Sequence, residues 1–350
     1  TPLYSSAASD VYKRQGPGLA AALGLESVAT EPQALGDRLS VVQPTTSHLL
    51  DRGWQEVKAL EARYLRQPFF KEVFGEELPV LPGLDQALML NALRQYDESG
   101  QYEAIVYTGA SDRSTLLMLG LPEVLAWYVR RFTKVVETSD FAKAISPFIQ
   151  PMMAAVSLDP LSSFSAGQPW DGPLAELNGL LDRGRSSLAN PQRLAAWLVT
   201  DARPEAIASS TYLWGCAQQA GVSVAGVLAA GSAAGSADFG TTDALNGAFS
   251  PLAVTAVTIE STQATAIADW PDFGTIARQA PHPIDIDLAN RQVRLFLPGF
   301  TKAQIKLVQS GPELTIEAGD QRRNLLLPPP LAGRAITGAK FSDRSLIISL

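Results

Sequence analysis

The last seventy residues of the chain alternate apolar and polar positions in short segments that Pro and Gly separate. Side chains along a strand point alternately to its two faces, so this alternation predicts strands that are each buried on one face. The expected strands are Ile284–Leu288, Gln292–Leu297, Ile305–Leu307, Leu314–Ile316, Leu325–Leu327, Ala339–Phe341 and Ser345–Leu350. Helical periodicity is absent there, and this part of the chain is therefore expected to be a small all-β module.

Two motifs occur in this module in a fixed order. Leu297-Pro298-Gly299-Phe300 follows one expected strand, and the pattern Ala-x-Phe-x-Asp-x-x-Leu runs from Ala339 into the last strand. Strand alternation alone fits any small β-sandwich. The ordered pair of motifs resembles the α-crystallin domain of small heat-shock proteins, over Pro283 to Leu350. The resemblance implies an α-crystallin-like sandwich.

The module departs from that family at two places. Arg344 follows Asp343 where the family usually has Gly. The chain also stops at Leu350 without the Ile-x-Ile tail through which small heat-shock proteins link into large oligomers. Large assemblies of the heat-shock type are therefore not expected.

Residues 16–275 show a different rhythm, in which short apolar runs alternate with amphipathic segments of helix length. This order predicts a mostly parallel sheet covered by helices, the α/β class. The expected strands are Leu39–Val42, Ala104–Tyr107, Ala196–Thr200 and Val222–Leu228. Residues 133–190 interrupt the rhythm with Pro147, Pro151 and Pro160 and are expected to form a subdomain of short, broken helices. A loose loop is expected near residues 230–248, where small residues dominate.

Four segments are therefore expected along the 350 residues. Residues 1–15 do not begin with Met, lack the apolar stretch of a secretory signal, and are expected to be a non-native leader outside the fold. Residues 16–275 form the α/β body, residues 276–282 a linker, and residues 283–350 the sandwich.

Composition excludes several classes of function. The formal charge is -7, and the sequence has no basic stripe with interleaved aromatic residues, so nucleic acid is not expected as a partner. The sequence has no apolar run of about 18 residues, so an integral membrane protein is not expected. The single cysteine, Cys216, fits a reducing compartment, so we expect a cytoplasmic protein. Cys216, His48 and His282 have no partners at ligand spacing, and no metal site is expected.

The segment Ile105 to Glu123 runs from an apolar strand through the polar turn Thr108–Ser114 into a helix. Ligands of α/β proteins bind at this carboxyl edge of a parallel sheet. The segment resembles the switch II region of the arsenical-pump and tail-anchored-protein-targeting ATPases. Together with the sandwich, it resembles the photosynthetic branch of that family, over Gly16 to Leu350.

This resemblance implies a P-loop fold, ATP with Mg²⁺ as cofactors, and a homodimer in the complete protein. It implies nucleotide contacts at Gly18, Gly109, Thr115 and Glu205, and catalytic positions at Thr108 and Asp112. It also implies that the 133–190 subdomain covers hydrophobic or membrane-bound client proteins. The residues expected to contact clients are Phe141, Phe148, Met152, Met153 and Phe164.

Two departures concern the chemistry. The Gly-rich phosphate loop that opens the family's fold does not occur in the sequence, so the chain as given is expected to bind no ATP. Thr108 stands where the family has an Asp that orients the Mg²⁺ shell, and a neutral hydroxyl supplies no charge to hold that ion. Asp112 is a candidate substitute, and the alternative for Asp112 is a solvated turn or helix-capping residue.

Three functions remain open at this point. The first is an ATPase for ATP-linked handling or targeting of client proteins, inactive as the chain stands. The second is a nucleotide-independent chaperone or scaffold in which the ATPase fold has decayed. The third, the ATPase subunit of an anion pump, is the least supported because the clustered cysteines of metalloid-responsive relatives are absent.

Overall fold

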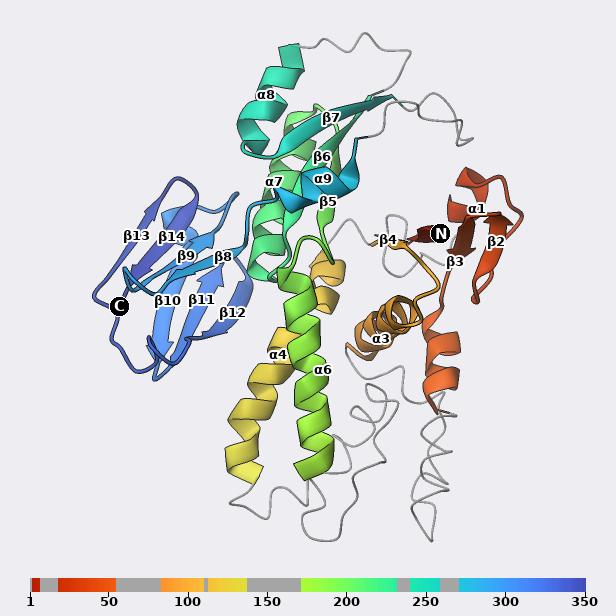
Figure 1. Cartoon of the computed structure of the whole chain (residues 1–350). Coiled ribbons are helices and arrows are strands. Elements are labelled where there is room, and N and C mark those ends of the chain that lie inside the picture. The colour runs from red at the N-terminus through yellow and green to blue at the C-terminus, as the bar shows by residue number, and fades with distance from the viewer. Residues whose placement is uncertain are drawn as a thin grey trace, which may run out of the picture. The chain divides into compact units, whose positions relative to one another are not determined.

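The computed structural model describes residues 2–6, 18–54, 83–109, 113–136, 171–231, 240–258 and 271–350. The chain divides into two compact units. The first comprises Thr1–Leu121 and Leu125–Asp182, and the second comprises Pro122–Val124 and Arg183–Leu350. Each unit contains its own parallel strands, which confirms the expected α/β class (Figure 1).

The sheet of the first unit has the strand order β2-β3-β1-β4. Its strands are β1 Pro2–Ser6, β2 Gln33–Gly36, β3 Leu39–Val42 and β4 Ala104–Thr108. β1 is parallel to both β3 and β4, whereas β2 is antiparallel to β3. The predicted strand Leu39–Val42 is confirmed, and β4 extends one residue beyond its predicted end, to Thr108.

Strand β1 comes from the fifteen residues that were expected to lie outside the fold. Pro2 to Ser6 pair in register with Ala104 to Thr108 on one side, and Leu3 to Ser5 pair with β3 on the other. Strands pair through main-chain N–H and C=O groups, so any extended segment can fill a position between two open strand edges. Side-chain pattern therefore gave no signal for this strand, and leaving Pro2–Ser6 out of the fold was wrong.

The helices of the first unit include α1 Gly18–Ala22, a helical stretch at residues 46–54, and α3 Leu84–Glu98. Leu84, Leu88 and Ala92 recur at one-turn intervals along α3 and pack against Leu49 and Leu50. This spacing places one apolar stripe of α3 on the core.

Helices α4 Arg113–Val136 and α6 Asp171–Ala189 contain residues of both units. In the first unit, Ala126 of α4 packs with Leu177 and Leu181 of α6. α6 is one continuous helix of 19 residues, so the expectation of broken helices is wrong for residues 171–189. Pro173 lies in its first turn, where a missing N–H costs little. The prolines on which that expectation rested, at 147, 151 and 160, lie outside the described residues.

The second unit has a parallel sheet of order β5-β6-β7. Its strands are β5 Ala196–Thr200, β6 Val224–Gly231 and β7 Ala253–Thr258. Its further helices are α7 Pro204–Gln219, α8 Gly240–Phe249 and α9 Phe273–Arg278. The prediction for β5 is exact, and β6 begins two residues later than predicted.

Helix α8 lies where a loose loop was expected, so that expectation is wrong for residues 240–248. Leu245 and Phe249 are one turn apart and both buried, which gives this short helix an apolar stripe despite its many small residues. α9 likewise ends within the expected linker. Ala277 and Ala280 pack there on Ala225 of β6, so this connection is a packed element.

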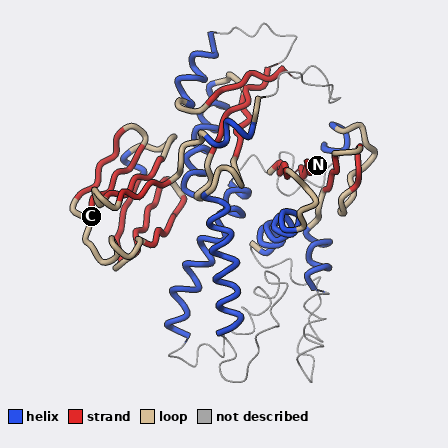
Figure 2. The backbone as a smooth tube through the Cα atoms, in the orientation of Figure 1, coloured by secondary structure: helices blue, strands red, loops and turns tan. Residues whose placement is uncertain are grey.

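The sandwich contains two antiparallel sheets, of order β10-β11-β12 and β13-β14-β9-β8 (Figure 2). The strands are β8 Ile284–Asp287, β9 Gln292–Phe296, β10 Ile305–Ser310, β11 Glu313–Ala318, β12 Gln321–Leu326, β13 Gly338–Ser342 and β14 Ser345–Ser349. Each of the predicted strands is found. Leu295, Leu314, Ile316 and Ile348 are buried and form the core between the sheets.

Candidate functional site

Strand β4 is followed by helix α4 in the order that the sequence predicted, and residues 110–112 between them lie outside the described residues. β4 ends at Thr108, which is exposed. Gly109 follows, and α4 begins at Arg113. A Cβ atom on Gly109 would overlap the side chain of Thr115, with the Thr115 Cγ2 at 2.6 Å and its Cβ at 2.9 Å. Thr115 can therefore close over the strand end only because residue 109 is glycine. The structure thus brings together two of the predicted nucleotide-contacting residues.

The described residues of this turn do not suffice for a magnesium-nucleotide site. Thr108, Gly109 and Arg113–Thr115 carry hydroxyl groups and one guanidinium but no carboxylate. Mg²⁺ in nucleotide sites is usually held by carboxylates together with the phosphates. Asp112, the candidate substitute for the missing carboxylate, lies outside the described residues. The described geometry therefore supports no catalytic step through ATP or Mg²⁺.

A second strand end lies in the other unit, where β5 leads into α7. Asp201 accepts hydrogen bonds from the Arg203 main-chain N–H at 2.9 Å and from its Nη2 at 2.7 Å. The Arg203 side chain is the largest cause that lowers the pKa of the Asp201 carboxyl. Pro204 follows as the first residue of α7, where a missing N–H is tolerated. The pair therefore fixes the entry into the helix.

Glu205 lies in the first turn of α7 and is exposed, so its carboxylate is favourably placed near the positive end of the helix dipole. Asp201 and Arg203 were not among the site residues expected from the sequence. The available signal was Asp201 at a strand end followed by Arg203-Pro204, a combination typical of an Asx turn that starts a helix.

The remaining predicted residues fall into two groups. Gly18 is the first residue of α1 and is exposed. The client-contacting residues lie outside the described residues, and their prediction stays open. They are Phe141, Phe148, Met152, Met153 and Phe164.

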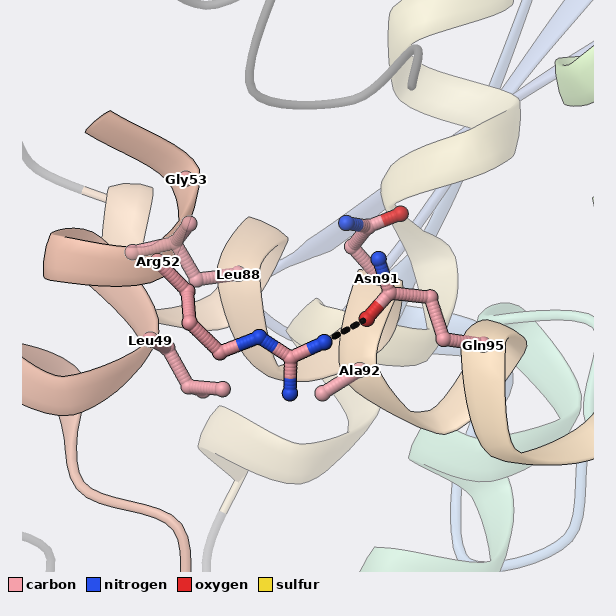
Figure 3. Close-up of a pocket in the computed structure, with 7 residues that line it drawn as sticks. All are labelled: Leu49, Arg52, Gly53, Leu88, Asn91, Ala92 and Gln95. Atoms are coloured by element: carbon pink, nitrogen blue, oxygen red, sulfur yellow. Dashed lines mark hydrogen bonds between the residues drawn. The ribbon is translucent and has the colours of Figure 1, made fainter. Parts of the chain in front are cut away.

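A pocket in the first unit lies between the helical stretch 46–54 and α3 (Figure 3). Arg52 points across it, and its Nη2 donates to the Gln95 Oε1 at 3.5 Å. Its Nη1 also approaches Glu31 at 3.5 Å, so the guanidinium is already engaged. The cavity volume is about 20 Å³, far below the roughly 300–1,000 Å³ of typical ligand pockets. This pocket contains none of the predicted site residues.

Within the ranges that the structure describes, none of the helices combines the length and apolar character needed to cross a membrane. In the same ranges, no three His, Cys, Asp or Glu side chains gather closely enough to hold a metal ion.

Comparison with known proteins identifies both parts of the chain. Residues 17–228 match the profile described as anion-transporting ATPase, and residues 289–350 match an HSP20-like domain found in ArsA. Two relatives that carry the name "Putative arsenical pump-driving ATPase", from Chlorobaculum tepidum and Prosthecochloris vibrioformis, are each 25% identical over 108 residues, which is 31% of this chain and 27% of each relative. One from Aquifex aeolicus is 19% identical over 103 residues, 29% of this chain and 26% of the relative.

The matched stretch thus spans about a quarter of the length of these relatives. The first profile, by contrast, covers more than half of the chain, and the second covers most of the sandwich. Both resemblances inferred from sequence motifs are confirmed. The chain belongs to the anion-transporting ATPase family and carries the HSP20-like domain of that family at its carboxyl end.

Proposed function

We propose that this chain is part of an ATPase-family protein that handles hydrophobic or membrane-bound client proteins in an ATP-linked cycle in the cytoplasm. The observation that carries the proposal is the β4–Gly109–α4 turn, closed by Thr115 at the carboxyl edge of parallel strands. Ligands of α/β proteins bind at such an edge. Membership of the family adds nucleotide and Mg²⁺ as the general cofactors.

In this proposal, ATP closes a homodimer of the complete protein and hydrolysis reopens it. The 350 residues contain no G-x-x-x-x-G-K-[ST] loop, whose backbone N–H groups and lysine hold phosphates. The chain as it stands therefore neither binds nor hydrolyses ATP, and turnover belongs to a longer form that carries the loop.

A second candidate is a nucleotide-independent chaperone or scaffold. Thr108 favours it, because the hydroxyl of Thr108 cannot supply the negative charge with which the family's Asp orients the metal ion. The two candidates differ in what a carboxylate at this position would do. A functional ATPase gains from the charge, whereas a decayed fold does not.

The first test is calorimetric titration of this chain with Mg-ATP. We expect no heat of binding at micromolar nucleotide, because no phosphate-holding loop offsets the desolvation of the triphosphate. Micromolar affinity would contradict the proposed dependence on the missing loop.

The second test changes Thr108 in a longer form that carries the loop. We expect Thr108→Asp to raise steady-state ATP hydrolysis, because a carboxylate can anchor the metal's water shell. Thr108→Asn is the matched control, since it has nearly the same size without the charge. Equal rates in wild type and both variants would favour the scaffold.

A further inference from the structure

The carboxyl half of α7 is enclosed on every side. The buried residues of that half are Trp214, Gly215, Cys216, Ala217, Gln218 and Gln219. Six consecutive positions cover more than one full helical turn, so they point in all directions around the axis. β5 and β6 contact this helix, and so do β9 and β12 of the sandwich (Figure 1). α7 is therefore an internal element shared by the parallel sheet and the HSP20-like domain.

The helix and the sandwich meet at close range. The rings of Tyr212 and Phe300 are 5.6 Å apart between centroids, and those of Trp214 and Phe296 are 5.3 Å apart, both edge to face. A Cβ atom on Gly215 would overlap the carbonyl oxygen of Pro298 and come within 2.9 Å of the Phe300 ring. The Leu-Pro-Gly-Phe motif of the sandwich thus lies directly on the α7 backbone.

Arg323 of β12 reaches the carboxyl end of α7. Its Nη1 donates to the Gln218 main-chain oxygen at 2.9 Å, and α7 ends at Gln219. The last carbonyl groups of a helix have no partner within the helix and carry its negative partial charge. Burial lowers the pKa of Arg323 to about 10, so the guanidinium is still protonated at neutral pH.

Arg344 of the β13–β14 turn reaches the carboxyl end of α8 in the same way. Its Nη1 donates to the main-chain oxygens of Ala248 at 3.0 Å and Ser250 at 2.8 Å, and its Nη2 donates to that of Gly247 at 3.2 Å. The guanidinium carbon also lies 5.9 Å from the centre of the Trp214 ring. One side chain thus connects the sandwich to α8 and α7.

The backbone of this turn has a conformation that is unusual for an arginine. Asp343 and Arg344 have φ angles of 50° and 58°, the left-handed region that favours glycine. An arginine at this position is strained relative to the Gly that small heat-shock proteins usually have there. The compensating interaction is the set of three hydrogen bonds, two to main-chain oxygens of α8 and one to that of Ser250, the residue that follows the helix.

We propose that the HSP20-like domain acts as an internal helix clamp, whose arginines Arg323 and Arg344 bind the carboxyl ends of α7 and α8. The surface around these arginines and the Leu297–Phe300 loop is therefore covered by the chain's own helices and is not accessible to client proteins. The sandwich and α7 open together, as one cooperative body. The clamp does not depend on nucleotide, so its test stands apart from that of the proposed function.

The only cysteine of the chain provides the probe. Cys216 is completely buried in α7, so a thiol reagent reacts with it only after the surroundings of the helix open. We compare Arg344→Gly with Arg291→Gly in the full chain. Arg291 also has a positive φ, 55°, and is exposed. Both changes relieve backbone strain and remove one charge, but only the first removes bonds to a helix end.

We expect Arg344→Gly to speed the labelling of Cys216 roughly tenfold or more, because charge-assisted hydrogen bonds are lost, and Arg291→Gly to leave the rate unchanged or slower. Arg344→Lys keeps the charge but not the fork of donors, and its rate should lie between those of wild type and Arg344→Gly. Equal rates in the two glycine variants would overturn the clamp.

Native-state hydrogen exchange of the wild-type chain gives a second test that needs no variant. The amides of Cys216 to Gln219 and those of Leu314 and Ile316 should show one common opening reaction as denaturant is raised. Exchange of the sandwich amides at a denaturant concentration that leaves the α7 amides protected would also overturn the clamp.

Discussion

The close contact between Gly215 and the sandwich makes an unusual substitution result predictable. Replacing a glycine inside a helix by alanine normally stabilises the protein, by about 1 kcal/mol in an exposed helix interior. At Gly215 the added Cβ would overlap the Pro298 carbonyl oxygen and approach the Phe300 ring at 2.7 and 2.9 Å. Forcing extra atoms into a packed interface costs about 1–3 kcal/mol. Because a main-chain oxygen cannot rotate away, we expect Gly215→Ala to destabilise the chain by about 1–3 kcal/mol.

Gly247 in α8 supplies the matched control. No atom lies within 4 Å of a Cβ built on it, and its main-chain oxygen can still accept from Arg344. Gly247→Ala should therefore show the ordinary gain, about 0.5–1 kcal/mol. The two glycine-to-alanine changes are thus predicted to have opposite signs.

Urea unfolding measures both effects as shifts of the midpoint at constant slope. A further variant, Gly215→Ala with Phe300→Leu, separates the two obstacles. The smaller side chain removes the ring but leaves the Pro298 oxygen in place. The double variant should therefore still be less stable than Phe300→Leu alone. Gly215→Ala as stable as Gly247→Ala would refute the close packing of the sandwich on α7.

Two further predictions concern a buried charge and the client-binding segment. The pKa of Arg323 is about 10 in the folded chain, below the ordinary value of an arginine side chain, so above about pH 10 the unfolded chain binds more protons than the folded chain and stability rises with pH. The unfolding free energy of wild type minus that of Arg323→Met should therefore be flat up to about pH 10 and rise by about 1.4 kcal/mol by pH 11, and a flat difference throughout would contradict the burial of the charge. In the proposed client-facing segment, changing Phe148, Met152 and Met153 together to Ser should weaken the binding of an apolar helical peptide and leave the urea midpoint unchanged; a large loss of stability would instead identify these residues as core.

Local sequence pattern predicted most of the strands. Alternation identified the strands of the sandwich, and compact apolar runs identified β3, β4, β5 and β6, because both signals arise within the strand itself. β7 and α8 were missed because Ala, Gly, Ser and Thr dominate their sequences and give weak periodicity. β1 was missed because its position depends on main-chain pairing with β3 and β4.

The closeness of Gly109 and Thr115 follows from the order of the chain, in which a strand end and a helix start lie only a few residues apart. Their role as nucleotide contacts stays a prediction. The docking of the sandwich on α7 was not expected from the sequence. Arg323 and Gln218 are 105 residues apart, and no local pattern records a contact over that distance.

The same separation sets a timescale for synthesis of the chain. The residues of α7 leave the ribosome well before Arg323, and with synthesis at roughly 5–20 residues per second the 105 intervening residues require roughly 5–20 s. During that interval the face of α7 that carries Tyr212 and Gly215 has no sandwich to cover it. Hydrophobic surface exposed for seconds is a target for general chaperones and a site of aggregation. A ribosome that stalls between α7 and β12 would therefore display this helix face for as long as the stall lasts.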